Sequence, residues 1–498
     1  MALVPTIIYW TYRVRGNNGD SGMTLHSALN IALFPPLFFF SALYYTDVVS
    51  TIAVLMFYWY FLFAQKRQLS TPAQFLPTIC LGLASLLFRQ TNIFWVAIFP
   101  AGLVLINELD RGHPVVKDSM HRRAEGFGDS MLSIARTSFK MEVVYDLPVR
   151  DAWLEGAAFS PVPFHIALIH IADYVKTVVS IASCTAKVAT KPERIINTIK
   201  VLSPFLTLIG LFASFVVWNG GVVLGDKSNH VATLHLPQLL YIWPYFTFFS
   251  WPLLYPYLAT IPVWFAAKLP VVTSLENLLI FKRRQLLPRP WITLAFIVLA
   301  ALVVHFNTIV HPFTLADNRH YNFYVFRLLM RPSWVKYAVP PIYIVCGWAC
   351  IQALGARSIT ESRDIAEAGA DDSVPKSANK QEKDALFVPD GDVSVNTSFV
   401  LVWLATSALQ LVTAPLVEPR YFILPWIFWR MHVPLRMTSE KSDNTASTFA
   451  KTKLSTLDHR LVLETVWSLS VSAVTGYIFL YWGFSWAQEP GKIQRFMW

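Results

Sequence analysis

The sequence of 498 residues is 54% hydrophobic, 15% aromatic and only 14% charged, and its formal net charge is +10. This is more apolar surface than a soluble protein of this length normally buries, so the composition excludes an ordinary soluble domain and indicates a membrane protein. The basic residues stand in short clusters between apolar runs and follow no single amphipathic face. We therefore interpret them as topology signals and expect no nucleic-acid partner.

Apolar runs of roughly twenty residues recur along the chain, which is the length that a helix needs to cross about 30 Å of hydrocarbon. Because a helix satisfies its own backbone hydrogen bonds in lipid, the sequence predicts an all-α polytopic membrane protein with about eleven crossings. The expected crossings are 27–46, 48–64, 76–88, 93–107, 201–218, 239–267, 291–310, 321–355, 397–414, 421–437 and 461–483. The runs 76–88 and 93–107 are short enough for a tight hairpin, and Arg327 and Pro332 predict a bend or an interfacial helix inside 321–355.

The basic clusters all fall on one side when the crossings are counted, and the positive-inside rule makes that side cytosolic. The clusters are Arg13 with Arg15, Lys66 with Arg67, and the basic residues of 111–123, 282–289 and 430–453. The loops 108–160 and 356–396 lie on the same side, and the second is predicted to be a flexible linker because it is rich in Asp, Glu, Lys and Ser. The segment 161–184 mixes apolar residues with His165 and Asp173 and predicts an interfacial amphipathic helix.

Five polar motifs fall together on the opposite side of the membrane by the same count. They are the segments 44–47, 88–92, 224–230, 311–321 and 418–421. A charged group at a helix end in lipid is costly unless it is solvated, paired or functional, so these motifs need an explanation. Their shared face predicts one polar site built from distant parts of the chain.

Three arginines of these motifs, Arg89, Arg319 and Arg420, are candidates for binding a phosphate, because a guanidinium presents a fork of donors to an anion. The alternative is that each arginine reaches the lipid headgroups or pairs with a neighbouring acid such as Asp317 or Glu418. Three arginines on one face favour an anionic ligand.

Four carboxylates, Asp47, Asp226, Asp317 and Glu418, are candidates for a general base or for contacts to sugar hydroxyls. The alternative is helix capping or ion pairing, which we favour for Asp226 and Glu418.

No metal site is expected. His230, His311 and His320 do not have the spacing of a known ligand pattern, and the four cysteines form no CxxC pair. No P-loop, GxGxxG or GxSxG element stands between a strand and a helix, so nucleotide hydrolysis and serine-hydrolase chemistry have no support.

Four segments, taken in order, are similar to those of a known family. They are FRQTN at 88–92, LGDKS at 224–228, HPFTLADNRHY at 311–321 and EPRYFILP at 418–425. Together they resemble the dolichyl-phosphate-glucose-dependent α-1,2-glucosyltransferases of the endoplasmic reticulum, which add the terminal glucose to the lipid-linked oligosaccharide used for N-glycosylation. The resemblance covers nearly the whole chain, and its LADNRHY run is highly specific.

The resemblance implies a GT-C-like bundle, a single transmembrane glycosyltransferase domain over 1–498 and polar active-site loops in the lumen of the endoplasmic reticulum. It implies a hexosyltransferase that uses dolichyl-phosphate-glucose as donor and a dolichyl-diphosphate oligosaccharide as acceptor, by inverting single displacement and without a metal or another cofactor. The candidates for binding the donor phosphate or the substrates are Arg89, Gln90, Asn92, Lys227, His311, Asp317, Asn318, Arg319, His320, Glu418, Arg420 and Tyr421.

The family also has a first transmembrane helix and a first lumenal loop with an acidic pair, which this sequence does not contain. The resemblance thus implies an N-terminally incomplete chain that starts inside the second family helix, with Val4 to Tyr12 as its tail. The catalytic base is then unassigned, Asp47 is a candidate for it, and we expect little or no transfer from these 498 residues.

A nonenzymatic membrane protein, either a transporter or a regulator of another membrane protein, is the alternative. Transporters often contain inverted repeats and broken helices around a site at mid-membrane. The sequence has no clear repeat, and its polar motifs stand at helix ends, so the transferase hypothesis is favoured.

Overall fold

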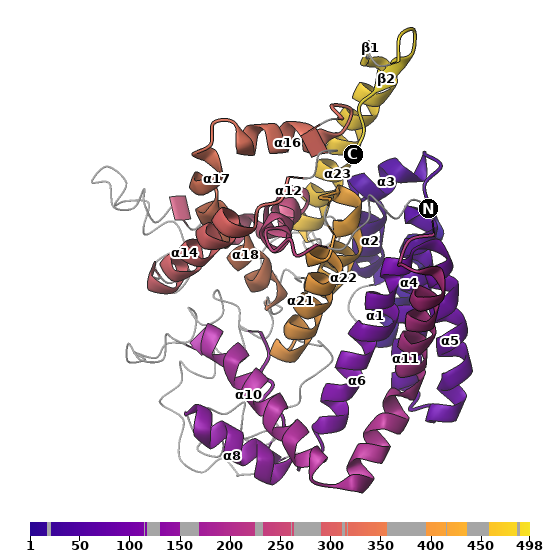
Figure 1. Cartoon of the computed structure of the whole chain (residues 1–498), viewed down its shortest axis with the longest axis vertical. Coiled ribbons are helices and arrows are strands. Elements are labelled where there is room, and N and C mark those ends of the chain that lie inside the picture. The colour runs from indigo at the N-terminus through magenta and orange to yellow at the C-terminus, as the bar shows by residue number, and fades with distance from the viewer. Residues whose placement is uncertain are drawn as a thin grey trace, which may run out of the picture.

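A computed structural model describes residues 1–16, 21–113, 115–116, 130–149, 169–224, 233–259, 261–262, 290–310, 314–315, 317–355, 395–414, 416–435, 458–485 and 489–498. In these residues the chain is helical apart from short turns and one antiparallel hairpin of two strands. The helices lie side by side, with α21 and α22 between the purple helices of the first third of the chain and the salmon helices α14–α18 (Figure 1). The all-α prediction is confirmed.

The first half of the bundle contains the helices between Leu3 and Asn219. In chain order they are α1 (Leu3–Arg15), α2 (Ser21–Ala32), α3 (Pro35–Ser41), α4 (Asp47–Lys66), α5 (Thr71–Phe88), η1 (Gln90–Asn92), η2 (Phe94–Ile98), α6 (Phe99–Leu109), α8 (Met131–Met141), α10 (Ile169–Ala189) and α11 (Pro192–Asn219). The second half is α12 (Gln238–Leu258), α14 (Pro290–Asn307), α16 (Tyr321–Met330), α17 (Val335–Ala338), α18 (Pro340–Leu354), α21 (Thr397–Val412), η5 (Pro419–Phe422), α22 (Ile423–His432), α23 (His459–Tyr481), β1 (Gly483–Ser485) and β2 (Ile493–Arg495).

Seven helical segments are long and apolar enough to cross a membrane within the part of the chain that the structure describes. They are α4, α5, Gln90–Leu109, α11, α14, Val335–Leu354 and α23. The pair α2 and α3, bent by 65°, makes an eighth if it is one span. The prediction of a multi-pass membrane protein is confirmed, and so is the bend inside 321–355, where α16, α17 and α18 follow one another.

The three other expected crossings are helices that fall short of this test. α12 has 21 residues but is broken at Ser250, and α21 has 16 residues. α22 has ten residues, all buried, and at 1.5 Å per residue it is about 15 Å long. The expected full crossing at 421–437 is therefore wrong, because a short aromatic helix buried by protein has the same apolar composition as a span facing lipid.

Two of the expected segments outside the crossings are partly helical in the structure. The expected interfacial helix 161–184 corresponds to α10, and the expected loop 108–160 contains α8, which packs on α10. Residues 356–394, most of the expected flexible linker, lie outside the described residues.

The core of the bundle is aromatic and surrounds α22. Trp426 stacks on Phe34 with ring centroids 3.8 Å apart, and Trp95 stacks on Phe428 at 4.4 Å. All four rings are at most 1% exposed. Such close-packed rings fix the position of α22 and of the turn η5 that precedes it.

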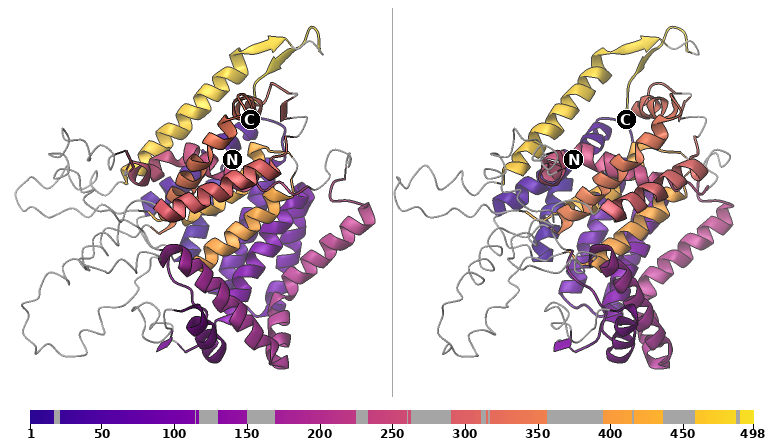
Figure 2. Two further views of the ribbon diagram at one scale, coloured as in Figure 1. Left: turned by 60° about the vertical axis from the view of Figure 1, so that its left-hand side comes forward. Right: turned by 90° about the vertical axis from the view of Figure 1, so that its left-hand side faces the viewer.

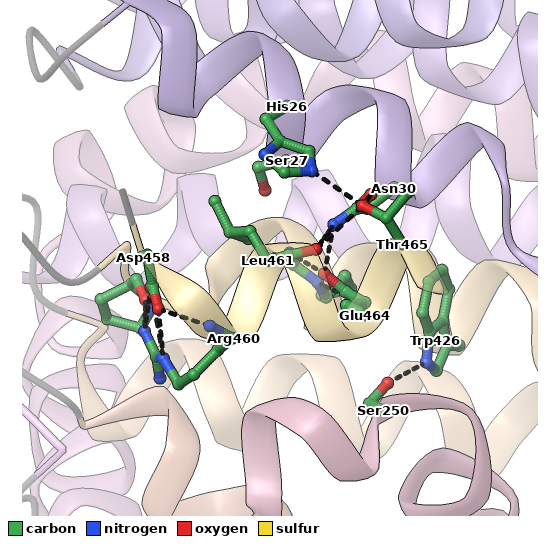
Figure 3. Close-up of polar contacts among 12 residues, drawn as sticks. His26, Ser27, Asn30, Ser250, Trp426, Asp458, Arg460, Leu461, Glu464 and Thr465 are labelled. Atoms are coloured by element: carbon green, nitrogen blue, oxygen red, sulfur yellow. Dashed lines mark hydrogen bonds and ion pairs between the residues drawn. The ribbon is translucent and has the colours of Figure 1, made fainter. Parts of the chain in front are cut away.

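The long helix α23 is joined to this core by polar side chains (Figure 3). Asn30 Nδ2 donates to Leu461 O and to Glu464 Oε2, each at 2.9 Å, and Arg430 Nε donates to Glu464 Oε1 at 2.7 Å. These contacts connect α2, α22 and α23 in the interior of the protein.

Candidate active site

Asp47 and Arg89 form an ion pair where two helices end. Asp47 is the first residue of α4 and Arg89 follows α5 directly, and Arg89 Nη2 lies 3.0 Å from Asp47 Oδ1. The side chain of Asp47 is 2% exposed, whereas that of Arg89 is 21% exposed. Asp47 Oδ2 is buried and has no hydrogen-bond partner. The pair therefore holds Arg89 through one carboxylate oxygen, and part of the guanidinium side chain reaches the surface.

Asn92 fixes the turn that carries Arg89. Its Nδ2 donates to Ser50 Oγ in α4 and to the backbone oxygen of Ser85 in α5, both at 2.8 Å. Asn92 is completely buried, whereas Gln90 in the same turn is half-buried. We infer that Asn92 positions the turn, because a buried amide bonded to one residue in each of two helices has no access to a ligand.

Glu418 and Arg420 form a second ion pair at the turn η5. Arg420 Nε donates to Glu418 Oε2 at 2.9 Å, and Arg420 Nη2 makes a shorter contact with the same oxygen. The guanidinium carbon also lies 5.2 Å from the ring centroid of Tyr45 and 6.0 Å from that of Phe40. Both distances are within the range of a cation–π contact, an arrangement that favours arginine over lysine.

Buried side chains from other helices hold the backbone of η5. The Tyr245 hydroxyl donates to Pro419 O at 3.1 Å, and Gln410 Nε2 donates to Tyr421 O at 2.9 Å. Gln410 Oε1 accepts in turn from Trp95 Nε1 at 2.5 Å. The orientation of the second pair thus depends on α12, α21 and η2.

The two ion pairs form one electrostatic group, which we call the polar-end cluster: Asp47, Arg89, Glu418 and Arg420. Burial lowers the pKa of Arg420, but the charges of Glu418 and Asp47 outweigh it and raise that pKa above its ordinary value. Burial and the charge of Glu418 raise the pKa of Tyr421 to about 12, and all four members of the cluster act on this phenol. Two positive and two negative charges therefore lie within interaction distance of one another.

The segment 317–320 makes a third set of charged contacts. Arg319 Nε lies 2.9 Å from Asp317 Oδ1 and Arg319 Nη2 lies 2.7 Å from Asp317 Oδ2. Although partial burial opposes it, these hydrogen bonds hold the pKa of Asp317 below its usual value. His320 Nε2 lies 3.7 Å from the same carboxylate, and Asn318 Oδ1 is buried without a hydrogen-bond partner.

Contacts between the segments bring the third set to the same end of the bundle as the polar-end cluster. Asn322 Nδ2 donates to Val417 O at 2.7 Å, which connects the start of α16 to the residue before Glu418. The ring of Tyr45 faces Arg420, and Tyr45 also lies close to Arg319. The pKa of Arg319 is raised mainly by Asp317, and its interaction with Tyr45 adds to that increase. Figure 1 shows α3, α16 and the last residue at this end, opposite α8.

The structure therefore brings together ten candidates from three motifs and the candidate base Asp47. The ten are Arg89, Gln90, Asn92, Asp317, Asn318, Arg319, His320, Glu418, Arg420 and Tyr421. Lys227 and His311, together with Asp226 and His230, lie outside the described residues. Each of the three arginines is paired with an acid, which is the pairing that the sequence left open as an alternative to phosphate binding.

Some residues at the site were not predicted from the sequence. Tyr245 and Gln410 hold η5, while Gln494, Met497 and Trp498 contact the segment 319–321. A signal existed for Gln410, since a polar amide within an apolar helix needs a partner. No local pattern marks the last five residues of the chain as part of a site, because their contacts lie more than 170 positions away.

The family comparison covers most of the chain. The sequence model of the DIE2/ALG10 family matches residues 1–431. The chain belongs to the DIE2/ALG10 family. The match includes the polar-end cluster and the segment 317–320, and it ends before α23 and the β-hairpin.

Several relatives of this DIE2/ALG10 chain have the name "Dol-P-Glc:Glc(2)Man(9)GlcNAc(2)-PP-Dol alpha-1,2-glucosyltransferase". The protein from Aspergillus fumigatus is 40% identical over 98% of this chain and 80% of its own length. The protein from Emericella nidulans is 37% identical over 98% of this chain and 81% of its own length, and the mouse protein is 27% identical over 99% and 76%. No solved structure matches the chain.

Proposed function

We propose that the protein transfers glucose from dolichyl-phosphate-glucose, in α-1,2 linkage, to the lipid-linked oligosaccharide, and that its polar end faces the lumen of the endoplasmic reticulum. The names of relatives at 27–40% identity support the reaction, and they do not support a transporter or a regulator. The observation that carries the proposal is the polar-end cluster, because it joins arginines and carboxylates from distant helices at one end of the bundle.

The reaction is a single displacement that inverts the anomeric carbon. The 2-hydroxyl of the acceptor glucose attacks this carbon, the bond to the phosphate oxygen breaks, and dolichyl phosphate leaves with the bonding electron pair. A carboxylate takes the proton of the attacking hydroxyl, and arginine donors stabilise the charge that develops on the phosphate.

Arg420, Arg89 and Arg319 are the donors that we assign to the phosphate. Their side chains are 24%, 21% and 31% exposed, and each is oriented by a carboxylate that holds part of its guanidinium. Such charge-assisted hydrogen bonds are directional, and they are stronger in a site that excludes water. Asp47 stays the candidate base. Its Oδ2 is unpaired but buried, so a substrate hydroxyl reaches this oxygen only once the side chains that cover it move.

We further propose that transfer needs no metal ion, because arginines can neutralise a leaving phosphate. Treating the enzyme with a chelator should leave the rate of transfer unchanged. A loss of transfer that added Mg²⁺ or Mn²⁺ restores would contradict this part of the proposal.

The experiment that tests the function uses microsomes from cells that lack the native transferase and are supplied with the full-length locus that encodes these 498 residues. Lipid-linked glycans are released and measured, and the expected result is an oligosaccharide one glucose longer than in the empty-vector control. If the protein reaches the membrane and the oligosaccharide stays one glucose short, the proposed function is wrong.

A further inference from the structure

The segment 489–498 folds back from the hairpin onto the polar end of the bundle (Figure 2). β2 pairs with β1, and the chain then runs beside residues 319–321, where Met497 N donates to Arg319 O at 2.9 Å and Tyr321 N donates to Met497 O at 3.1 Å. These two bonds make a parallel bridge between His320 and Met497. The backbone of the segment that carries Arg319 is therefore held by a part of the chain that lies beyond the residues matched by the family model.

Gln494 contacts the Arg319 side chain itself. Its Oε1 accepts from Arg319 Nη1 at 3.1 Å, its Nε2 donates to Glu489 Oε2 at 2.8 Å, and the residue is only 8% exposed. Asp317 binds the guanidinium through Nε and Nη2, so Gln494 contacts the third nitrogen. An amide oxygen orients the cation without adding a negative charge, whereas a second carboxylate would weaken the attraction of the site for an anion.

The hairpin is attached firmly enough to act as a support. Arg495 Nη1 donates to Leu480 O in the last turn of α23 at 2.7 Å. A Cβ atom on Gly483 would lie 2.1 Å from Ile493 Cγ2, so the two strands approach as closely as glycine allows. Beyond β2, the Trp498 ring packs against Tyr321 and the core residue Phe249, with centroids 5.0 and 5.4 Å away.

We propose that Gln494 is a positioning residue for Arg319, and that the segment 489–498 fixes this guanidinium where the phosphate of the donor lipid binds. The proposal rests on the proposed function, because it takes Arg319 as a phosphate ligand. Gln494 acts through Arg319 and does not itself touch the substrate.

The test compares three variants, each made in the full-length locus that encodes these 498 residues, by steady-state kinetics with dolichyl-phosphate-glucose as the varied substrate. Gln494→Ala removes one hydrogen bond to a charged group and should raise the donor KM roughly three- to tenfold, while kcat and the acceptor KM change less than about twofold. Gln494→Glu keeps the shape but adds a charge beside Glu489 and should raise the donor KM further. Ser485→Ala, at an exposed position of β1 in the same hairpin, is the matched control and should change neither KM nor kcat.

A second measurement does not depend on turnover. The thermal stabilisation of each purified variant by dolichyl phosphate reports the affinity for the leaving group, because a ligand that binds only the folded state raises the melting temperature. The concentration of dolichyl phosphate needed for half-maximal stabilisation should rise by a factor similar to that of the donor KM.

Three outcomes would overturn the inference, and they are distinguishable from a failure of the proposed function. If Gln494→Ala changes neither quantity while Arg319→Lys raises both, Gln494 does not position Arg319, although the function stands. If Arg319→Lys also changes neither, Arg319 is not a phosphate ligand. If Gln494→Ala and Gln494→Glu reduce kcat and weaken both substrates equally, the role of Gln494 is structural.

Discussion

The short helix α22 separates two kinds of ion pair. Arg420, just before its first residue, pairs with Glu418 and keeps 24% of its side chain exposed. Arg430, near its last residue, pairs with Glu464 of α23, and these side chains are 0% and 1% exposed. About ten residues of helix, roughly 15 Å, lie between a cation that reaches the surface and a cation that is completely enclosed.

The exposure of each ion pair determines whether it can bind a ligand. Arg430 binds Glu464 through two parallel bonds of 2.7 Å, and Asn30 adds a third contact to the carboxylate (Figure 3). No ligand can reach such a pair without unfolding, so it serves to connect α2, α22 and α23. The pairs at the polar end have the same chemistry, but their arginine side chains are partly exposed, so a ligand at the surface could reach them.

The largest effect is expected on breaking the buried pair. Glu464→Ala leaves Arg430 as an uncompensated charge and should destabilise the protein by about 3–5 kcal/mol, enough to remove most folded protein from the membrane. The measurement is the melting temperature and yield in detergent. The double variant Arg430→Met with Glu464→Leu replaces the pair by apolar side chains and should recover much of the loss. Equal losses in the single and double variants would contradict this account.

A smaller loss of stability is expected at Asn92, which is buried but belongs to the polar end. Asn92→Ala breaks the bonds to Ser50 and Ser85 and should cost about 2 kcal/mol, because buried partners are left unsatisfied. It should also weaken donor binding, because the Arg89 turn is released from α4. Thr91→Ala in the same turn is the control for stability. Reduced stability with unchanged donor affinity would show that Arg89 does not contact the donor.

At Arg420 the effect should fall on binding and leave stability intact. Arg420→Lys keeps the charge but loses the planar fork, and we expect the donor KM to rise about tenfold with a melting temperature within about 2 °C of the unmodified protein. Arg67→Lys, at the opposite end of α4, is the matched control. An unchanged donor KM would favour pairing with Glu418 as the whole role of Arg420.

The sequence predicted some of the helices and the placement of the polar motifs. Continuous apolar runs correspond to the helices α4, α5, α11, α14 and α23. Such a run predicts both that a helix is present and roughly how long it is, because a spanning helix must match the thickness of the hydrocarbon. Counting crossings also placed at one end the four polar motifs that have charged residues in the described part of the chain, since each helix reverses the direction of the chain. The count does not depend on knowing how the helices pack.

Arg430 shows where that reasoning fails. Its position in a basic cluster predicted a cytosolic topology signal, but the structure buries it against Glu464, 34 positions away. The contacts of Gln494 and Trp498 with the segment 319–321 could not be predicted from the sequence either. A pairing between distant helices leaves no periodic signal in either one, so neither composition nor spacing could distinguish a solvated arginine from a buried one.

A buried histidine provides the smallest and most specific test. His235, just before α12, is 0% exposed, and neither ring nitrogen has a hydrogen-bond partner. Burial lowers its pKa from 6.5 to about 4, so the folded protein holds it neutral whereas the unfolded chain protonates it below pH 6.5. Its contribution to stability is therefore complete above pH 6.5 and is lost as the pH falls from 6.5 towards 4, by about 1 kcal/mol at pH 5.5.

Replacing His235 by Phe removes the titration and should flatten the dependence of the melting temperature on pH between 7 and 5, whatever its effect at pH 7. A melting curve for His235→Phe with the same acid sensitivity as the unmodified protein would mean that another group titrates. The buried interior would then contain a second titratable group that, unlike Arg430, has no partner of opposite charge.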